Sequence, residues 1–391
     1  MTLYIHAYSL INALGRGKDE VSAALEVWRT RGARGASPLD GERWTLVDGR
    51  TSPVGRVRHP LPAVTIAPYD SRNNRLLLAA LADIEDEVNA AIARVGSQRV
   101  ALVLGTSTSG IREAEIAVAA SERGETLPPQ FDYEQQELGS PSLFLAAHLG
   151  LEGPAMTIST ACSSSARAFI TARRLLASGQ ADVALVGGAD SLCGLTLNGF
   201  DSLESLSEQR CQPFAAGRDG INIGEGAALF LVSLEPAPLA LLGDGESSDA
   251  WHISAPHPQG EGAERAMRMA LTRAGLEAGQ VGYVNAHGTA TRLNDEMESR
   301  ALARLFPNKV PVSSTKVLTG HTLGAAGATE AALCCLLIER GLPLPPQGET
   351  ADPALAPIAL VQEQGPVDII MSNSFAFGGN NVSLIFGKEA S

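Results

Sequence analysis

One cysteine occupies the position in this sequence that best suits nucleophilic chemistry. Cys162 lies in the segment TACSSS at 160–165, between an expected strand over 154–159 and an expected helix over 163–177. The amino-terminal end of a helix carries partial positive charge, which lowers the pKa of a thiol and favours the thiolate. The amide of Cys162 at such an elbow can also donate a hydrogen bond to an oxyanion. A buried core thiol is the alternative for this residue.

Two histidines stand among small residues later in the chain. His287 lies in NAHGTAT at 285–291, and His321 lies in TKVLTGHTLGAAG at 315–327. Gly, Ala and Thr neighbours leave space for a ligand, and imidazoles exchange protons near neutral pH. Each histidine taken singly also fits a hydrogen-bonded residue at the end of an element. No His or Cys pair has the spacing of a zinc site, so we expect no metal.

A glycine-flanked aromatic loop is the third candidate. SNSFAFGGNN at 372–381 follows an expected strand, and Gly378 and Gly379 permit unusual backbone angles. Such a loop can present amide donors or act as a gate, and a plain turn before a strand over 382–387 is the alternative. Neither GK[ST] nor GxGxxG is present in this segment, which argues against a phosphate-binding loop.

Composition narrows the class of protein. The chain has 391 residues, of which 45% are hydrophobic and 19% charged, so it can bury a sizeable core. A net charge of −13 argues against nucleic acid as the main partner. No apolar run approaches the roughly 20 residues of a membrane span, and no basic segment precedes an apolar one at the start. Five cysteines without a CxxC fit a reducing, cytoplasmic location.

Short apolar runs that alternate with helical periodicity predict an α/β fold. Because these runs are apolar on both alternations, we expect strands buried on both faces of parallel or mixed sheets. They lie at 99–104, 154–159, 182–186, 281–285 and 368–372.

Two similar halves are expected from the order of these elements. Strand 154–159, helix 163–177 and strand 182–186 form one βαβ unit, and a second unit runs from 310 to 372. Prolines at 236 and 238 punctuate the chain between them. We therefore expect one half over 1–235, carrying the candidate nucleophile, and another over 236–391, carrying both histidines.

Four motifs, in this order and at these distances, resemble those of the β-ketoacyl-acyl-carrier-protein synthases of the type I/II branch. They are TACSSS at 160–165, NAHGTATRLND at 285–295, STKVLTGHTLGAAGATEA at 314–331 and SNSFAFGGNN at 372–381. The resemblance runs from Leu3 to Phe386. It implies the thiolase fold, in which two βαβαβ-type halves pack as a five-layered αβαβα core, usually in a dimer.

The resemblance implies catalytic roles for five residues. Cys162 would accept the acyl group, and His287 and His321 would promote decarboxylation of a malonyl group. Lys316 would hold and electrostatically tune His321, and Glu330 would belong to the same network.

Further residues are implied to bind substrates. Thr289 and Thr291 match hydroxyls that hold a phosphopantetheine arm, and Thr108 matches a position on the acyl pocket. The amides of Cys162 and Phe377 would form an oxyanion hole, with the Phe377 ring as a gate. Ala376 and Asn380 depart from the usual Gly and Thr of this loop, so we expect a stiffer gate.

The implied activity is a decarboxylating Claisen condensation. An acyl chain on Cys162 would join a malonyl group carried by acyl carrier protein, giving CO₂ and a β-ketoacyl chain two carbons longer, without a free cofactor. Carrier proteins are acidic, so Arg72 and Arg75 are the expected contacts with that partner. The chain would form a homodimer, or a heterodimer with a chain-length-factor-like ketosynthase subunit.

Related functions are less well matched. Thiolases need a second active-site cysteine near the carboxyl terminus, and 375–381 has none. Initiating synthases with a Cys-His-Asn set are disfavoured because the second basic position is His321. A non-catalytic chain-length subunit commonly lacks the nucleophile that is present here. The segments 71–81 and 218–231 are similar to ketosynthases of bacterial aryl-polyene clusters, and housekeeping fatty-acid elongation is the alternative pathway.

Overall fold

A 12-stranded sheet organises the computed structural model, which describes residues 1–31 and 35–389. Its strand order is β12-β11-β10-β13-β14-β9-β1-β8-β7-β5-β6, with β2 beside β1. The strands of the first half are β1 (Leu3–Asn12), β2 (Gly15–Arg16), β5 (Val100–Gly105), β6 (Ala155–Ile158), β7 (Val183–Asp190) and β8 (Gly226–Ser233). Those of the second half are β9 (Leu239–Ser248), β10 (Tyr283–Asn285), β11 (Pro311–Ser313), β12 (Ala359–Leu360), β13 (Ile369–Ala376) and β14 (Asn380–Lys388).

The two halves pair their strands in the same way. β5 is parallel to β6 and β7, and β8 is antiparallel to β7 and β1. In the second half β10 is parallel to β11 and β13, and β14 is antiparallel to β13 and β9. β1 and β9 join the halves, with Leu3 opposite Leu241. The expected similarity of the halves is therefore present, whereas their separation into domains at residue 235 stays a prediction.

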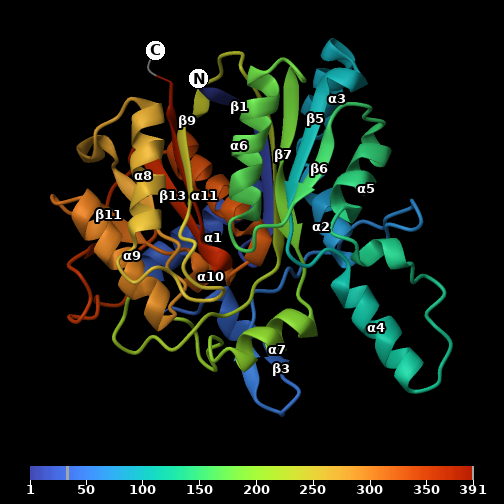
Figure 1. Ribbon diagram of the computed structural model, residues 1–391, viewed down its shortest axis with the longest axis horizontal. Helices are drawn as coiled ribbons and strands as arrows, with labels where there is room; N and C mark the ends of the chain where they lie inside the picture. The colour runs from blue at the N-terminus through green and yellow to red at the C-terminus, as the bar shows by residue number, and fades with distance from the viewer. Residues whose placement is uncertain (32–34, 390–391) are drawn as a thin grey trace.

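Helices cover the sheet on its outer side in both halves and fill the space between the two halves (Figure 1). α6 (Ser164–Ala177) and α11 (Ala326–Arg340) lie in the middle, where α11 is apolar on nearly every side because strands of both halves contact it. The outer helices are α2 (Arg72–Leu81), α3 (Glu85–Val95) and α5 (Ser140–Leu149) on one side, and α8 (Glu261–Ala274) and α9 (Arg292–Leu305) on the other. This is the αβαβα arrangement that the resemblance implies.

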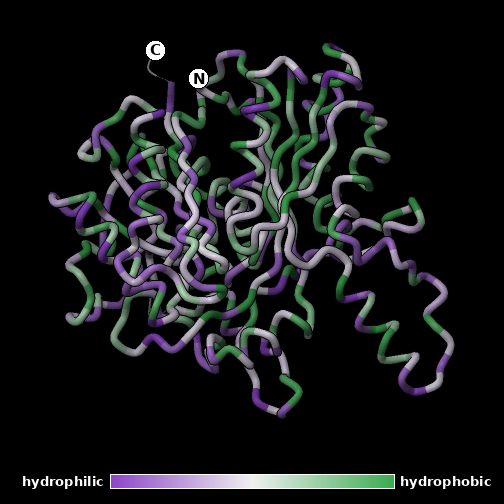
Figure 2. The backbone as a smooth tube through the Cα atoms, viewed as in Figure 1, coloured by the Kyte–Doolittle hydropathy of each residue, from purple (hydrophilic) through white to green (hydrophobic). Residues whose placement is uncertain are grey.

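The hydrophobic core follows these layers. One cluster joins α6 and α11 to the strands of both halves, with Phe169 packed edge-on against Phe230 and Phe386. Two further clusters lie beneath the outer helices. Figure 2 shows hydrophobic colour along the strands and hydrophilic colour along many outer loops. No helix in the described ranges is long and apolar enough to cross a membrane.

The expected strands are present, but one differs in burial. β5 and β7 are buried along their whole length, as predicted. β6 is partly exposed, with Ala155 open to solvent, so the expectation of burial on both faces is wrong for this strand. The reason is its place at the end of the sheet, where it has a neighbour on one side only.

Smaller elements extend from the core. They are α1 (Gly17–Arg31), the hairpin of β3 (Arg43–Thr45) and β4 (Thr51–Pro53), α4 (Ile111–Glu122), α7 (Gly194–Ser202) and α10 (Lys316–Thr319). Short 3-10 turns lie at Pro38–Gly41, Ser97–Arg99, Tyr133–Gln136, Ala278–Gln280, Leu323–Ala325 and Phe377–Gly379. α4 projects away from the body of the molecule (Figure 1).

Candidate active site

Cys162 lies at the elbow between β6 and α6, as the sequence predicts. Ala161 has a φ of 52°, in the left-handed region that residues with a side chain seldom adopt, and the chain turns sharply there. Ser164 begins α6 and its hydroxyl accepts a hydrogen bond from the amide of Thr160 at 2.9 Å. This turn presents the buried thiol of Cys162 to the other half of the molecule.

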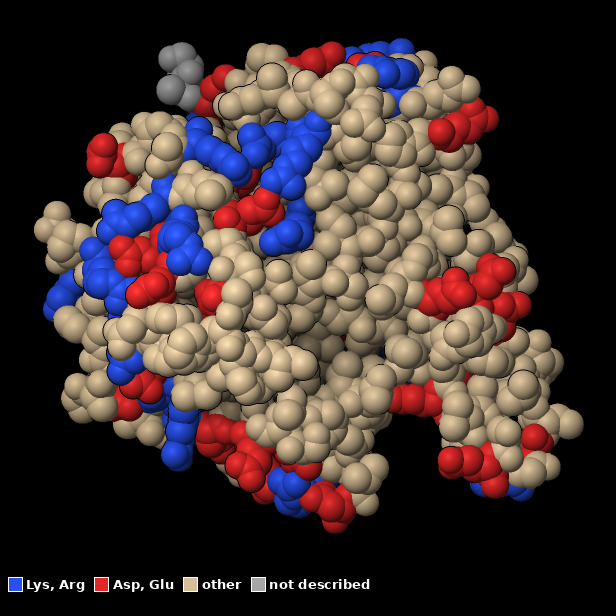
Figure 3. All heavy atoms as spheres, in the orientation of Figure 1, with Lys and Arg blue, Asp and Glu red and all other residues tan. Residues whose placement is uncertain are grey.

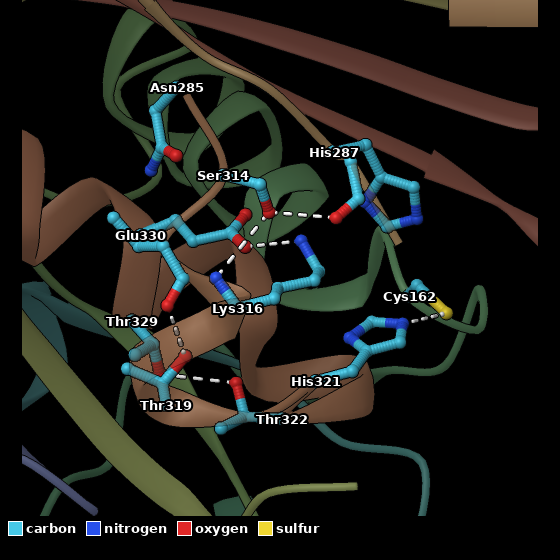
Figure 4. A network of polar contacts seen from close by, with 12 residues as sticks. Cys162, Asn285, His287, Ser314, Lys316, Thr319, His321, Thr322, Thr329 and Glu330 are labelled. Atoms are coloured by element: carbon cyan, nitrogen blue, oxygen red, sulfur yellow. Dashed lines mark hydrogen bonds and ion pairs between the residues drawn. The ribbon is translucent and has the colours of Figure 1, made fainter. Parts of the chain in front are cut away.

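The thiol and the two imidazoles meet although they come from opposite halves. His321 Nε2 lies 3.0 Å from Cys162 Sγ. The rings of His287 and His321 have centroids 5.4 Å apart and are nearly perpendicular, at 83°. One ligand atom from each of the three residues lies within 4.8 Å of the others, which is also a geometry that metal ligands adopt. The folded chain thus assembles one Cys-His-His cluster (Figure 4).

Burial decides the charge state of these groups. It raises the pKa of Cys162 to about 12, against a smaller lowering by Lys316. The expected lowering of this pKa is therefore wrong, because the thiol is shielded from water. Burial and the nearby Lys316 also hold the pKa values of His287 and His321 well below the usual 6.5. Both imidazoles are neutral at pH 7, so His321 can accept the thiol proton.

Lys316 and Glu330 form a buried ion pair behind the histidines (Figure 4). Both side chains are 2% exposed. Burial raises the pKa of Glu330 to about 7, and Lys316 opposes that rise. Lys316 begins α10 and Glu330 lies on α11, so the pair ties together the elements on either side of His321. Lys316, Glu330 and His321 thus lie close together, and their roles in catalysis stay a prediction.

A cavity of about 460 Å³ leads from the cluster to the surface. Thr289 and Thr291 line it, and their hydroxyls are 2.9 Å apart. Phe377 lines it as well, with its ring centroid 5.6 Å from that of Phe200 on α7. Gly378 has a φ of 78° in the turn that carries Phe377, which favours glycine there.

Comparisons with known proteins agree with this geometry. A model of the N-terminal domain of β-ketoacyl synthases matches residues 71–237, and one of the C-terminal domain matches residues 240–349. A ketosynthase named ApeO from Xenorhabdus doucetiae, solved in complex with its chain length factor ApeC, is 50% identical; the match covers 99% of this chain and 98% of ApeO, with a TM-score of 0.93. The chain belongs to the β-ketoacyl synthase family.

Two other relatives extend the comparison. A β-ketoacyl synthase from Burkholderia phymatum is 29% identical over the full length of both chains, with a TM-score of 0.85. The 3-oxoacyl-[acyl-carrier-protein] synthase 2 of Rhizobium meliloti is 41% identical over 263 residues, which is 61% of this chain and 62% of that relative. The chain thus matches slightly less than two thirds of this relative's length. The fold is the thiolase fold of condensing enzymes, as expected.

Two buried carboxylates that support the site of this synthase were not predicted. Glu298 on α9 accepts hydrogen bonds from the amides of His287, at 2.9 Å, and Gly288, at 2.8 Å. Asp295 accepts one from the amide of Ala290 at 3.2 Å. The available signal was a pair of acids three residues apart, immediately after the histidine motif, because that spacing puts both on one face of a helix.

Asp190 at the end of β7 is a third such carboxylate. It accepts hydrogen bonds from the amide of Thr108 at 2.7 Å and from the amide of Ala325, in the turn after His321, at 3.0 Å. The hydroxyl of Thr108 also donates to it, at 2.7 Å. Thr108 is buried and does not line the cavity of this synthase, so its expected role at the acyl pocket stays a prediction.

The two arginines expected to contact a carrier protein are already paired. Arg72 donates to the buried Glu225 at 2.8 Å, and Arg75 donates to Asp70 at 2.7 Å. Both line a second pocket that shares no residue with the cavity at Cys162. Arg72 is therefore a structural cation of this synthase as well as a candidate contact.

Proposed function

We propose that this synthase catalyses the decarboxylating condensation of an acyl chain with a malonyl group carried by acyl carrier protein. The observation that carries the proposal is the 3.0 Å contact between Cys162 Sγ and His321 Nε2, with the neutral ring of His287 beside them at the end of an open cavity. These groups can serve two half-reactions in one place.

The first half-reaction transfers the acyl group. The sulfur of Cys162 attacks the thioester carbonyl while its proton passes to His321, which overcomes the high pKa of the buried thiol. The C–S bond to the pantetheine arm then breaks, and the arm leaves as a thiol with that proton. The amides of Cys162 and Phe377 are the proposed donors to the oxyanion, and such a donor typically contributes about 100- to 1000-fold in rate.

The second half-reaction forms the carbon–carbon bond. The bond between the malonyl carboxylate and its α-carbon breaks, CO₂ leaves, and the electron pair forms an enolate. Neutral His287 and His321 donate hydrogen bonds to the enolate oxygen. The α-carbon attacks the acyl carbonyl on Cys162, and the C–S bond breaks. The thiolate that leaves takes a proton from water and becomes the resting thiol again. Thr289 and Thr291 are proposed to hold the pantetheine arm in the cavity, and no free cofactor is required.

A second ketosynthase-like subunit is the proposed structural partner. β6 is the last strand of the sheet, so the backbone groups on its outer edge can form hydrogen bonds with a strand of another subunit. The projecting segment around α4 exposes large apolar side chains, including Ile116 at 52% and Val118 at 57%. The similar ApeO was solved with a chain length factor, which supports a heterodimer over a homodimer. We propose aryl-polyene biosynthesis in the cytoplasm as the setting, with fatty-acid elongation as the alternative.

The test is turnover of defined substrates. The purified synthase, alone and coexpressed with a candidate partner, is given an acyl-carrier protein and malonyl-carrier protein, and intact mass spectrometry follows the products. We expect an acyl adduct on Cys162 and a β-ketoacyl product two carbons longer. An unmodified Cys162 and no product in both preparations would favour the rival function, a non-catalytic chain-length subunit.

A further inference from the structure

The cluster of Cys162, His287 and His321 offers three ligand atoms of the kinds that zinc binds. One ligand atom from each residue lies within 4.8 Å of the other two, and His321 Nε2 lies 3.0 Å from Cys162 Sγ. A tetrahedral zinc ion bound to one sulfur and two nitrogens holds its ligand atoms about 3.5 Å apart. The contact at 3.0 Å and the limit of 4.8 Å lie on either side of that value, so small side-chain rotations would bring the three atoms to zinc-binding positions.

The cluster also has an open side. All three residues line the cavity of about 460 Å³ that leads to the surface, so a hydrated ion can reach them. Zinc sites with three protein ligands leave the fourth position of the tetrahedron to water. The cavity provides the space for that water molecule, and the chain need not supply a fourth ligand.

Charge along the cavity favours a cation. The charged residues that line it are Glu204, Asp219 and Arg292, two carboxylates against one guanidinium, which gives a net charge of −1. Figure 3 shows a hollow in the surface below α6 and acidic side chains around α7 on the same face. Lys316 behind the histidines is paired with Glu330, so this pair adds no net charge. A divalent cation is therefore attracted toward the thiol.

The ligand types select zinc among the common divalent cations. Thiolate and imidazole suit Zn²⁺, whereas Mg²⁺ and Ca²⁺ take oxygen ligands. His321 presents Nε2 to Cys162, and its other ring nitrogen, Nδ1, is buried without a hydrogen-bond partner among the described residues. Metal-bound histidines usually donate that second N–H to an acceptor, and loss of the acceptor weakens binding about 10- to 100-fold. The site therefore fits an ion that binds and leaves again.

We infer that Cys162, His287 and His321 form a reversible binding site for Zn²⁺, which inhibits the synthase by occupying its nucleophile. On binding, the S–H proton of Cys162 passes to water and a Zn–S bond forms, with no change of oxidation state. A metal-bound sulfur cannot attack a thioester. The binding goes beyond the proposed function, and only the inhibition rests on it. The expectation of no metal came from spacing along the chain, which does not detect ligands that come from opposite halves.

The experiment measures zinc binding in the absence of substrate. The purified synthase is dialysed against ZnCl₂, bound metal is counted by mass spectrometry, and alkylation of Cys162 by iodoacetamide is followed in parallel. The wild type should bind one zinc ion per chain and its alkylation should slow, whereas MgCl₂ should cause neither effect. Cys162→Ser and His287→Ala should each weaken binding by at least about 100-fold, the upper value for loss of an outer partner. His252→Ala, at an exposed histidine, and Cys335→Ala, in the core, are controls that should bind like the wild type.

Two results would overturn the inference. One is the same zinc affinity in the wild type and in both cluster variants, which would assign the binding to adventitious ligands. The other is unchanged alkylation of Cys162 at saturating zinc, a readout on the wild type that does not depend on whether the variants fold.

The proposed function is tested separately, because neither measurement needs a carrier protein. A synthase that binds zinc at Cys162 but never condenses acyl and malonyl groups would reject the proposed function and leave the zinc site standing. Where acylation of Cys162 is observed, ZnCl₂ should slow it and EDTA should restore it. Acylation at the full rate with zinc bound would reject the inhibition.

Discussion

The two carboxylate oxygens of Glu298 accept hydrogen bonds from the amides of His287 and Gly288, at 2.9 and 2.8 Å. Because Glu298 lies on α9, this helix fixes the backbone that carries the imidazole of His287. Glu298 contacts no reacting group, so it is a positioning residue whose effect passes through His287.

Replacing Glu298 should harm decarboxylation more than acylation. Glu298→Ala removes both acceptors and should lower CO₂ release from malonyl-carrier protein about tenfold, while Glu298→Gln, which keeps one acceptor, should lower it less. Acyl labelling of Cys162, measured by mass, should change less than twofold. Glu296→Gln on the same helix is the control. Equal losses in both half-reactions would point to general damage instead.

The two half-reactions should respond differently to loss of Cys162 and of His321. Cys162→Ala should abolish acyl labelling and condensation yet keep some malonyl decarboxylation, because the thiol forms no bond to the malonyl group. His321→Ala should slow acyl labelling, because it removes the acceptor of the thiol proton, and should lower decarboxylation by roughly 100-fold or more, as expected for a donor in the transition state. Cys335→Ala, in the buried core, is the control. Condensation by Cys162→Ala would refute the assigned roles.

The histidines should not titrate in the physiological range. Their pKa values are well below 6.5 because burial and Lys316 disfavour the imidazolium ion. NMR of histidine-labelled protein should show no inflection for His287 or His321 between pH 6 and 8. Lys316→Met removes the cation and should move both inflections to higher pH. A wild-type inflection near 6.5 would contradict this account of the site.

Removing only one member of the buried Lys316–Glu330 pair should lower the free energy of unfolding more than removing both members. Lys316→Met leaves Glu330 buried without its cation, and loss of one partner of a buried pair costs about 3–5 kcal/mol. The double variant Lys316→Met/Glu330→Leu removes both groups and should lose less. Urea unfolding monitored by circular dichroism compares the three proteins. A double variant less stable than the single one would contradict the pairing.

Thr108 tests the depth of the acyl pocket. Thr108→Phe should shorten the products if the position bears on the acyl chain, and Thr108→Val separates added bulk from loss of the hydroxyl that donates to Asp190. Product lengths are read by mass spectrometry of the released chains. Identical lengths in Thr108→Phe and wild type would remove Thr108 from the pocket.

Local patterns were enough to predict the parts of the site that carry recognisable motifs. Cys162 at a strand–helix elbow and His287 after a strand are set by short-range sequence, and α6 begins where the periodicity predicts. The Cys162 pKa could not be predicted, since the depth of burial depends on how the two halves pack. The role of Asp190 could not be predicted for the same reason, because its partners Thr108 and Ala325 lie more than 80 residues away in both directions.

The position of β6 at the exposed edge of the sheet could not be predicted from the sequence either. Three of its four residues, Ala155, Met156 and Ile158, are apolar, and only the order of strands makes it terminal. The pairing of Arg72 with Glu225 is a comparable case, because 153 residues separate the two. The hydrophobic periodicity of a sequence indicates which face of a helix or strand is apolar, but it does not indicate which other element packs against that face.

The pairing of β1 with β9 joins the two halves of the chain, and both halves supply catalytic residues. Cys162 follows β6 in one half, whereas His287 and His321 follow β10 and β11 in the other. A chain opened within 234–238, where it passes from β8 to β9, would yield one fragment with a nucleophile and one with its bases. Neither fragment alone could complete a turnover, and activity regained on mixing them would report directly that this interface had reassembled.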